Sequence, residues 1–79
     1  MDILNRLQEI FRDIFDDDVM VLTRELTAAD VEEWDSLAQI NIIVACEDEF
    51  KIKYELSEIA QLNNVGDMVE LTEKKLMKL

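Results

Sequence analysis

The sequence has no histidine and one cysteine, Cys46, among its 79 residues. These absences exclude histidine-based triads, imidazole metal sites and a disulfide framework, so we do not expect an enzyme. The absence of proline and the single glycine, Gly66, favour helices over tight hairpins. No continuous apolar run resembles a signal peptide or a membrane span. We therefore expect a cytoplasmic protein.

Basic residues are also scarce, because 8 Lys and Arg stand against 19 Asp and Glu and give a formal net charge of −11. Binding to nucleic acid requires clustered Lys and Arg, so this balance argues against nucleic acid and against anionic membrane surfaces. It favours protein partners with basic surfaces instead. At this length we expect one small domain over residues 1–79, and we expect it to be a monomer.

Apolar residues recur at helical spacing in three segments of the chain. They predict a first helix over residues 3–15, a second over 36–50 and a last one from 65 to 79, with a brief helix around 57–62. Residues 16–35 lose this period and form a long loop, in which Thr27 can cap a short helical turn. The fold class is therefore all-α: a small four-helix bundle, three helices longer and one short, with a long loop between helices 1 and 2.

Two details refine these boundaries. Three consecutive acids, Asp16 to Asp18, oppose a helix dipole and are assigned to the loop, and they lack the spacing of an EF-hand. The apolar face of the last helix is formed by six residues: Val65, Met68, Val69, Thr72, Leu76 and Leu79. Its basic C-terminal end carries Lys74, Lys75 and Lys78.

The second predicted helix carries two apolar rows, which one helix face cannot hold. The first row is assigned to the bundle core: Ile42, Ile43, Cys46 and Phe50. The second row is Leu37, Ile40 and Val44, at the same azimuth as Asn41, Glu47 and Asp48. Burying those polar neighbours would cost roughly 1–3 kcal/mol each, which favours an exposed binding strip. A loop folded over the strip, with both rows buried, is equally compatible with the pattern.

Asp35-Ser36-Leu37 begins the second predicted helix. Ser36 and Gln39 have the spacing of a capping box, and Asp35 is also a good cap. This tripeptide follows an amphipathic first helix and a long loop, and it precedes an acid-bearing helix that ends in Glu47-Asp48-Glu49-Phe50 and two further helices. Over almost the whole chain, the arrangement resembles the acyl carrier proteins.

The resemblance implies a cofactor and the residue that holds it. In that family the matching serine, here Ser36, carries a covalent 4′-phosphopantetheine arm, and Asp35 and Leu37 flank the attachment point. A separate phosphopantetheinyl transferase would add the arm from coenzyme A, which explains why the chain needs no histidine. The thiol of the arm, and not Cys46, would hold the acyl cargo as a thioester. Cys46 itself is expected to behave as a small core hydrophobe.

The resemblance also implies partners, namely acyl-activating, condensing or acyl-transferring enzymes with basic docking patches. Their expected contact surface is the strip with its polar neighbours: Leu37, Ile40, Asn41, Val44, Glu47 and Asp48. Acids before the helix would add to it: Asp30, Glu32, Glu33 and Asp35. The alternative is an unmodified acidic interaction module, in which Ser36 only caps its helix.

Two departures bear on the pathway. Many fatty-acid carriers have acids two and five residues after the serine, whereas this chain has Ala38 and Asn41. The cargo could therefore belong to fatty-acid or to specialised acyl biosynthesis. Trp34 could be an aromatic lid beside the serine or an anchor that holds the loop on the core.

Overall fold

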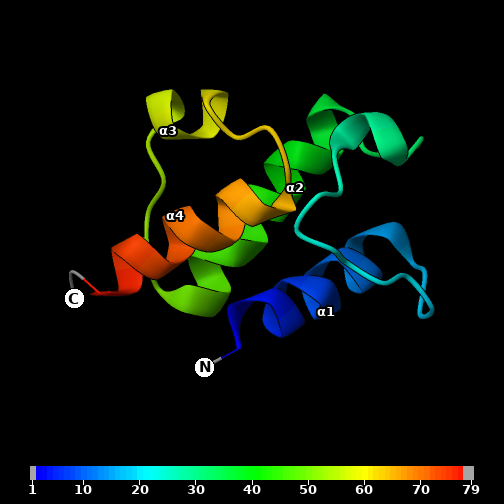
Figure 1. Cartoon of the computed structure of the whole chain (residues 1–79), viewed down its shortest axis with the longest axis horizontal. Helices are drawn as coiled ribbons and strands as arrows, with labels where there is room; N and C mark the ends of the chain where they lie inside the picture. Colours follow the sequence, from blue (N-terminus) through cyan, green and yellow to red (C-terminus); the bar gives the residue numbers. More distant parts are fainter. Residues whose placement is uncertain (1, 78–79) are drawn as a thin grey trace.

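The computed structural model describes residues 2–77 and shows five helical segments (Figure 1). They are α1 (Ile3–Phe15), a 3-10 turn (Ala28–Asp30), α2 (Ser36–Phe50), α3 (Leu56–Ala60) and α4 (Val65–Met77). The predicted all-α bundle with a long loop after α1 is confirmed. The brief helix begins slightly earlier than the sequence predicted, and the predicted roles of Lys78 and Leu79 lie outside the described residues.

A side-chain cap begins α1, and a residue in the left-handed conformation ends each of α1 and α2. The Asp2 carboxylate accepts a hydrogen bond from the Asn5 N–H at 3.1 Å and starts α1. Asp16 ends α1 in the left-handed conformation with φ 51°, and Lys51 ends α2 in the same way with φ 58°. The assignment of the three consecutive acids to the loop is therefore confirmed, because the first of them terminates the helix.

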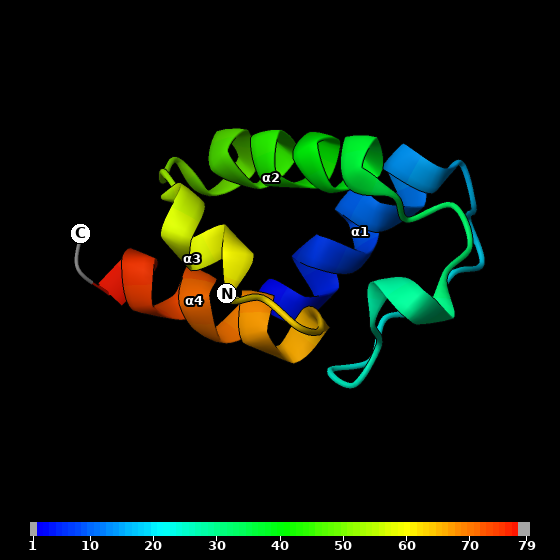
Figure 2. The same cartoon turned by 90° about the horizontal axis from the view of Figure 1, so that it is seen from above.

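α1 packs against both α2 and α4 and crosses between them (Figure 2). The apolar stripe of α1 supplies fully buried Leu7 and Phe11, which is the packing that its helical period predicts. The first row of α2 is buried as predicted: Ile42, Ile43, Cys46 and Phe50. Buried side chains of α4 complete the core: Val65, Met68, Val69 and Thr72.

The segment after α2 returns the chain to the core. Ile52 and Tyr54 are buried while Lys51 and Lys53 are exposed, as their alternation predicts. The Tyr54 hydroxyl is hydrogen-bonded to the Thr72 hydroxyl at 2.6 Å. This contact ties the link between α2 and α3 to the middle of α4.

Helix α3 is short and lies on the far side of α4 from α1 (Figure 1). The Lys75 ammonium of α4 lies 2.7 Å from a Glu58 carboxylate oxygen of α3. The Glu58 carboxylate also accepts the Glu55 N–H at 2.8 Å and so caps its own helix. α3 is therefore held on the bundle by an ion pair together with the partly buried side chains of Ile59 and Leu62.

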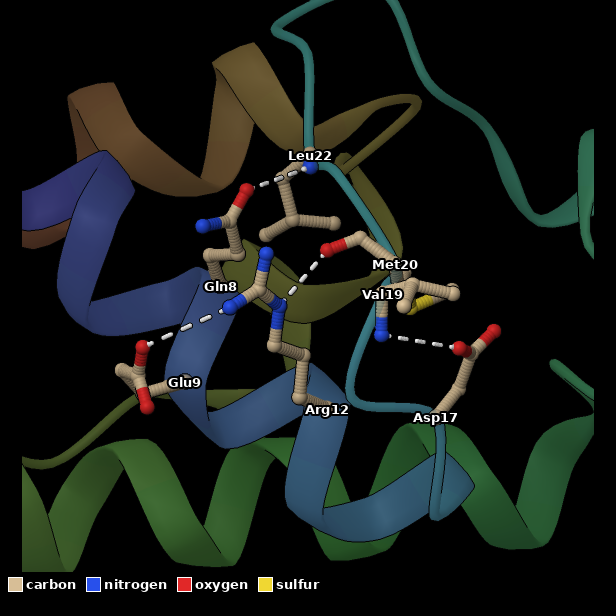
Figure 3. Close-up of polar contacts among 7 residues, drawn as sticks. All are labelled: Gln8, Glu9, Arg12, Asp17, Val19, Met20 and Leu22. Atoms are coloured by element: carbon tan, nitrogen blue, oxygen red, sulfur yellow. Dashed lines mark hydrogen bonds and ion pairs between the residues drawn. The ribbon is translucent and has the colours of Figure 1, made fainter.

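The long loop is fastened to α1 and to α4. On the side of α1, Arg12 Nε donates to the Met20 carbonyl at 2.7 Å, and Gln8 accepts the Leu22 N–H at 3.0 Å (Figure 3). Near the middle of the loop, the Val65 and Gly66 N–H groups donate to the carbonyls of Leu26 and Arg24 at 2.9 and 2.8 Å. These contacts satisfy the free N–H groups of the first turn of α4. They also fix the path along which the chain approaches α2.

The predicted turn within this loop is present as the 3-10 turn. Both the N–H and the hydroxyl of Thr27 donate to the Asp30 carboxylate, each at 3.0 Å. Within residues 2–77, no helix combines the length and the apolar character that crossing a bilayer requires.

Candidate cofactor-attachment site

Ser36 is the first residue of α2 and is exposed. The cap of the helix is Asp35, whose backbone is extended and whose carboxylate accepts the Ala38 N–H at 2.9 Å. Of the two cap candidates, the structure uses Asp35; the Ser36–Gln39 capping box is not formed, because Ser36 already lies inside the helix and Gln39 accepts the Trp34 indole N–H. Within the described part of the chain, the Ser36 hydroxyl has no hydrogen-bond partner. It remains available for modification.

The backbone around Ser36 favours an attached anion. Asp35 satisfies the N–H groups of Ala38 and Gln39, through its carboxylate and its carbonyl respectively. The N–H groups of Ser36 and Leu37 have no acceptor among residues 2–77. Free N–H groups and the positive end of the helix dipole stabilise a phosphate group at such a position. The residues present therefore fit a serine-linked phosphodiester.

A recess of about 490 Å³ opens beside Ser36, between the start of α2 and the segment around α3. This volume lies within the range of small-molecule pockets. Its apolar lining comes from Ile40, Ile59, Leu62 and the almost fully buried Met68. The recess could therefore receive an apolar chain tethered at the serine.

Trp34 lines the same recess. Its ring meets Phe11 edge-on, with centroids 5.0 Å apart and an interplanar angle of 88°. Its indole N–H donates to Gln39 Oε1 at 2.6 Å. The prediction of an anchor is confirmed by the contact with Phe11, and the indole also forms part of the wall beside the serine.

Comparison with known proteins agrees with this geometry. A family model described as the phosphopantetheine attachment site matches residues 5–72. A holo acyl carrier protein from Geobacter metallireducens, solved by NMR, is 50% identical, with a TM-score of 0.92 over 99% of this chain and 90% of that chain. The acyl carrier protein from Thermotoga maritima is 27% identical, with a TM-score of 0.82 over 95% of this chain and 87% of that chain. No curated protein matches the chain.

The chain belongs to the acyl carrier protein family. Members of this family are carriers and not catalysts, and their cofactor is 4′-phosphopantetheine. Both predictions, that the chain is not an enzyme and that its cofactor is phosphopantetheine, are confirmed at the level of the family.

The second apolar row of α2, the strip predicted from the sequence, is exposed to solvent. Leu37, Ile40 and Val44 are 67%, 58% and 57% exposed. The alternative in which the loop buries both rows is therefore wrong, because the contacts of Arg12 and Gln8 hold the loop on the side of α1. Exposed apolar residues at helical spacing remain available to a partner.

The polar neighbours of this strip differ in their surroundings. Asn41 and Asp48 are exposed. Glu47 is half-buried, and its carboxylate accepts the Tyr54 N–H at 2.9 Å. The sequence did not reveal this internal bond, because Tyr54 reaches Glu47 only after the chain has turned at the end of α2. Glu47 thus has a structural contact besides any contact with a partner.

A second, smaller recess of about 240 Å³ lies on the other side of the start of α2. It is lined by Ile14 and Phe15 at the end of α1 and by Leu37 and Asn41 of α2. Sequence reasoning missed it, because the period of α1 assigns Ile14 and Phe15 to the core, whereas the structure leaves both half-exposed. The recess extends the exposed strip toward α1.

Charge around the strip is of one sign. Residues 25–50 contain eight Asp and Glu and no Lys or Arg. The four acids of residues 30–35 are all exposed: Asp30, Glu32, Glu33 and Asp35. The described ion pair that reaches this region joins Arg6 of α1 to Glu49, at the far end of α2. The surface around Ser36 is therefore suited to a basic partner.

Cys46 is fully buried, as predicted, and is not a nucleophile of this site. Burial raises the pKa of its thiol to about 12, the Tyr54 hydrogen bond opposes this rise, and the charges of Glu47 and Glu49 add to it. A thiol with this pKa is protonated at neutral pH and reacts poorly. Over residues 2–77, no group of three or more His, Cys, Asp and Glu is placed to hold a metal ion.

Proposed function

We propose that this chain holds acyl intermediates as thioesters on a 4′-phosphopantetheine arm attached to Ser36 and presents them to enzymes of fatty-acid or specialised acyl biosynthesis. The observation that carries the proposal is the position of Ser36. Its hydroxyl is exposed at the first residue of α2, takes no part in the cap and lies at the edge of a recess of about 490 Å³. We also propose that residues 1–79 act as one carrier domain, as a monomer in the cytoplasm.

The chain contributes an acceptor hydroxyl rather than catalytic groups. A phosphopantetheinyl transferase would remove the Ser36 proton, and the serine oxygen would form a bond to the phosphorus that bears the pantetheine arm. The diphosphate bond of coenzyme A would break in the same step and release adenosine 3′,5′-bisphosphate. The free N–H groups of Ser36 and Leu37 would then face the resulting phosphodiester. Once attached, the arm supplies a thiol for the acyl group. The apolar recess can shelter that group from water.

Partner enzymes are proposed to dock on Leu37, Ile40, Asn41, Val44, Glu47 and Asp48. The acids of residues 30–35 would speed encounter with basic patches on acyl-activating, condensing or acyl-transferring enzymes. A carrier must leave each enzyme, and an exposed charged rim raises association rates more than it tightens complexes.

The proposed docking surface differs in one respect from that of many fatty-acid carriers. Ala38 is buried, so the position that carries an acid in many of those carriers is packed against the bundle here. Asn41 is exposed but neutral. We therefore propose that the partners of this carrier depend less on charge at the start of α2 and more on Leu37 and Ile40.

Incubation with a phosphopantetheinyl transferase and coenzyme A, followed by intact-mass measurement, tests the attachment. Wild type should gain the mass of one phosphopantetheine, and Ser36→Ala should gain none. Ser57→Ala is the matched control, since Ser57 is the other serine of the chain and is also exposed. It should be modified like wild type. No gain by wild type with several active transferases, or an equal gain by Ser36→Ala, would contradict the proposal.

A further inference from the structure

Two amide side chains line the recess beside Ser36, and the hydrogen bonds that they accept determine where the oxygen and the NH₂ group of each lie. Gln39 Oε1 accepts the indole N–H of Trp34 at 2.6 Å. Asn64 Oδ1 accepts the backbone N–H of Asp67 at 2.8 Å and caps α4. An indole N–H and a backbone N–H can only donate. In both side chains the oxygen must therefore face its donor, which leaves the NH₂ group for any other contact.

These NH₂ groups have no acceptor among residues 2–77. Gln39 and Asn64 are both half-buried, and both belong to the lining of the same recess. They come from different elements, Gln39 from the first turn of α2 and Asn64 from the residue before α4. The recess thus combines an apolar lining with two amide NH₂ groups that can donate hydrogen bonds to a ligand.

The position of Gln39 places one of these donors near the attachment point. Gln39 follows Ser36 by three residues of helix, a rise of about 4.5 Å along the axis. A plain alkyl chain in the recess would separate the amide groups from water without giving them an acceptor, which is unfavourable. A chain that carries an oxygen at the right place would satisfy them.

We propose that Gln39 and Asn64 form a donor pair that binds an acceptor oxygen delivered from Ser36, so that the recess prefers oxygen-bearing acyl chains, of the 3-oxo or 3-hydroxy class, over plain alkyl chains. The inference rests on the proposed function, because the arm on Ser36 delivers the ligand. The amide carbonyls of the arm have the same acceptor chemistry. They are the second source of the oxygen.

The side-chain NH₂ resonances of ¹⁵N-labelled protein distinguish these sources. The holo, butanoyl and 3-hydroxybutanoyl forms are compared, and the resonances of Asn41 and Gln61, both exposed and outside the recess, serve as references. Shifts of Gln39 and Asn64 that arise only in the 3-hydroxybutanoyl form assign the acceptor to the cargo. Shifts already present in the holo form assign it to the arm. Resonances that stay fixed in every loaded form would overturn the donor pair.

Isosteric variants test the preference without disturbing the fixed contacts. Gln39→Glu keeps an oxygen for Trp34, and Asn64→Asp keeps the cap of α4, while each removes an NH₂ group. Gln61→Glu and Asn41→Asp are the control variants, because each introduces the same negative charge outside the recess. Hydrolysis of the 3-hydroxybutanoyl thioester, relative to the same thioester of free pantetheine, should accelerate roughly three- to tenfold in each recess variant, the effect of one hydrogen bond. The butanoyl thioester and both control variants should be unchanged. Equal protection in wild type and the recess variants would overturn the inference.

Failure of the attachment is separable from failure of the donor pair. If no transferase modifies Ser36, the proposed function fails, and the donor pair is tested on Ser36→Cys alkylated with a bromoacetyl derivative of 3-hydroxybutanoylpantetheine. Cys46 is fully buried and will not compete for the reagent. Shifts of the Gln39 and Asn64 NH₂ resonances in the alkylated protein support the pair, and fixed resonances overturn it.

Discussion

Asp35 and Ser36 divide two tasks at the start of α2. Asp35 caps the helix with its carboxylate, and this leaves the hydroxyl of Ser36 exposed. The sequence left both residues open as caps, because Asp35 is a good cap and Ser36 and Gln39 have capping-box spacing. In the structure Asp35 is the cap, and the amide oxygen of Gln39 accepts the indole N–H of Trp34 instead of taking part in a capping box. That contact depends on how Phe11 positions the Trp34 ring, which no local pattern records.

Cys46 and Tyr54 form a buried titratable pair behind the site. Burial raises the pKa of the Cys46 thiol from 9.0 to about 12 and also raises the pKa of Tyr54. An acid whose pKa is raised on folding stays protonated in the folded state while it ionises in the unfolded state. The stability that this difference provides is complete below the unfolded pKa and is lost as the pH rises above it.

We therefore expect the free energy of unfolding to fall above pH 9.0, with Cys46 contributing up to about 1.4 kcal/mol per pH unit. Urea unfolding at about pH 8 and about pH 10.5 measures the change. Cys46→Ala is less stable at both values because it leaves a cavity, but its stability should fall less steeply with pH. Equal slopes for wild type and Cys46→Ala would contradict the burial of a protonated thiol.

Among the elements, the three long helices follow from the sequence because their apolar positions recur with the period of a helix. The fate of the second row of α2 does not follow, because its exposure depends on where the loop lies. The loop is placed by polar contacts between distant residues, such as Arg12 with Met20 and Gly66 with Arg24. The recess beside Ser36 has the same origin, since its lining combines residues of α2 with residues around α3.

The contact between the loop and α4 is made where the chain has a glycine, Gly66. The Gly66 N–H donates to the Arg24 carbonyl at 2.8 Å, and a Cβ on residue 66 would lie 3.0 Å from the same oxygen and 3.2 Å from Arg24 Cβ. A side chain at this position would therefore crowd the backbone of Arg24, and the loop would have to shift slightly to make room.

Gly66→Ala should lower the free energy of unfolding by about 1 kcal/mol, because overpacking and a weakened hydrogen bond outweigh the better helix propensity of alanine. Urea unfolding gives this value, and hydrogen exchange should show faster exchange at the amide of residue 66. Glu73→Ala is the control on the same helix, since Glu73 is exposed and its change should stay within about 0.5 kcal/mol. A Gly66→Ala protein more stable than wild type would show that the loop yields without cost.

For the molecule as a whole, the charge is unevenly distributed. The basic residues engaged in described ion pairs are Arg6, Arg12, Arg24 and Lys75. None of them belongs to residues 25–50, which contain eight acids and no Lys or Arg, although Arg6 reaches Glu49 from α1. The same unbalanced charge that suits a basic partner must repel itself when the carrier is free. Stability and docking are therefore coupled through one set of carboxylates.

Screening of this repulsion should stabilise the free carrier. We expect the melting temperature to rise by several degrees between about 10 and about 200 mM NaCl, since ~1 kcal/mol shifts the midpoint of a domain of this size by roughly 4–8 °C. A few millimolar Mg²⁺ should raise it further than NaCl of equal ionic strength, because a divalent ion can lie between neighbouring carboxylates. Glu32→Gln tests the origin of the effect: Glu32 belongs to this segment, is exposed and has no described side-chain hydrogen bond, so removing its charge should raise the melting temperature at low salt and reduce the response to salt. A midpoint that is the same at low salt, at high salt and with Mg²⁺ would show that the carboxylates are too far apart in the folded carrier to repel one another.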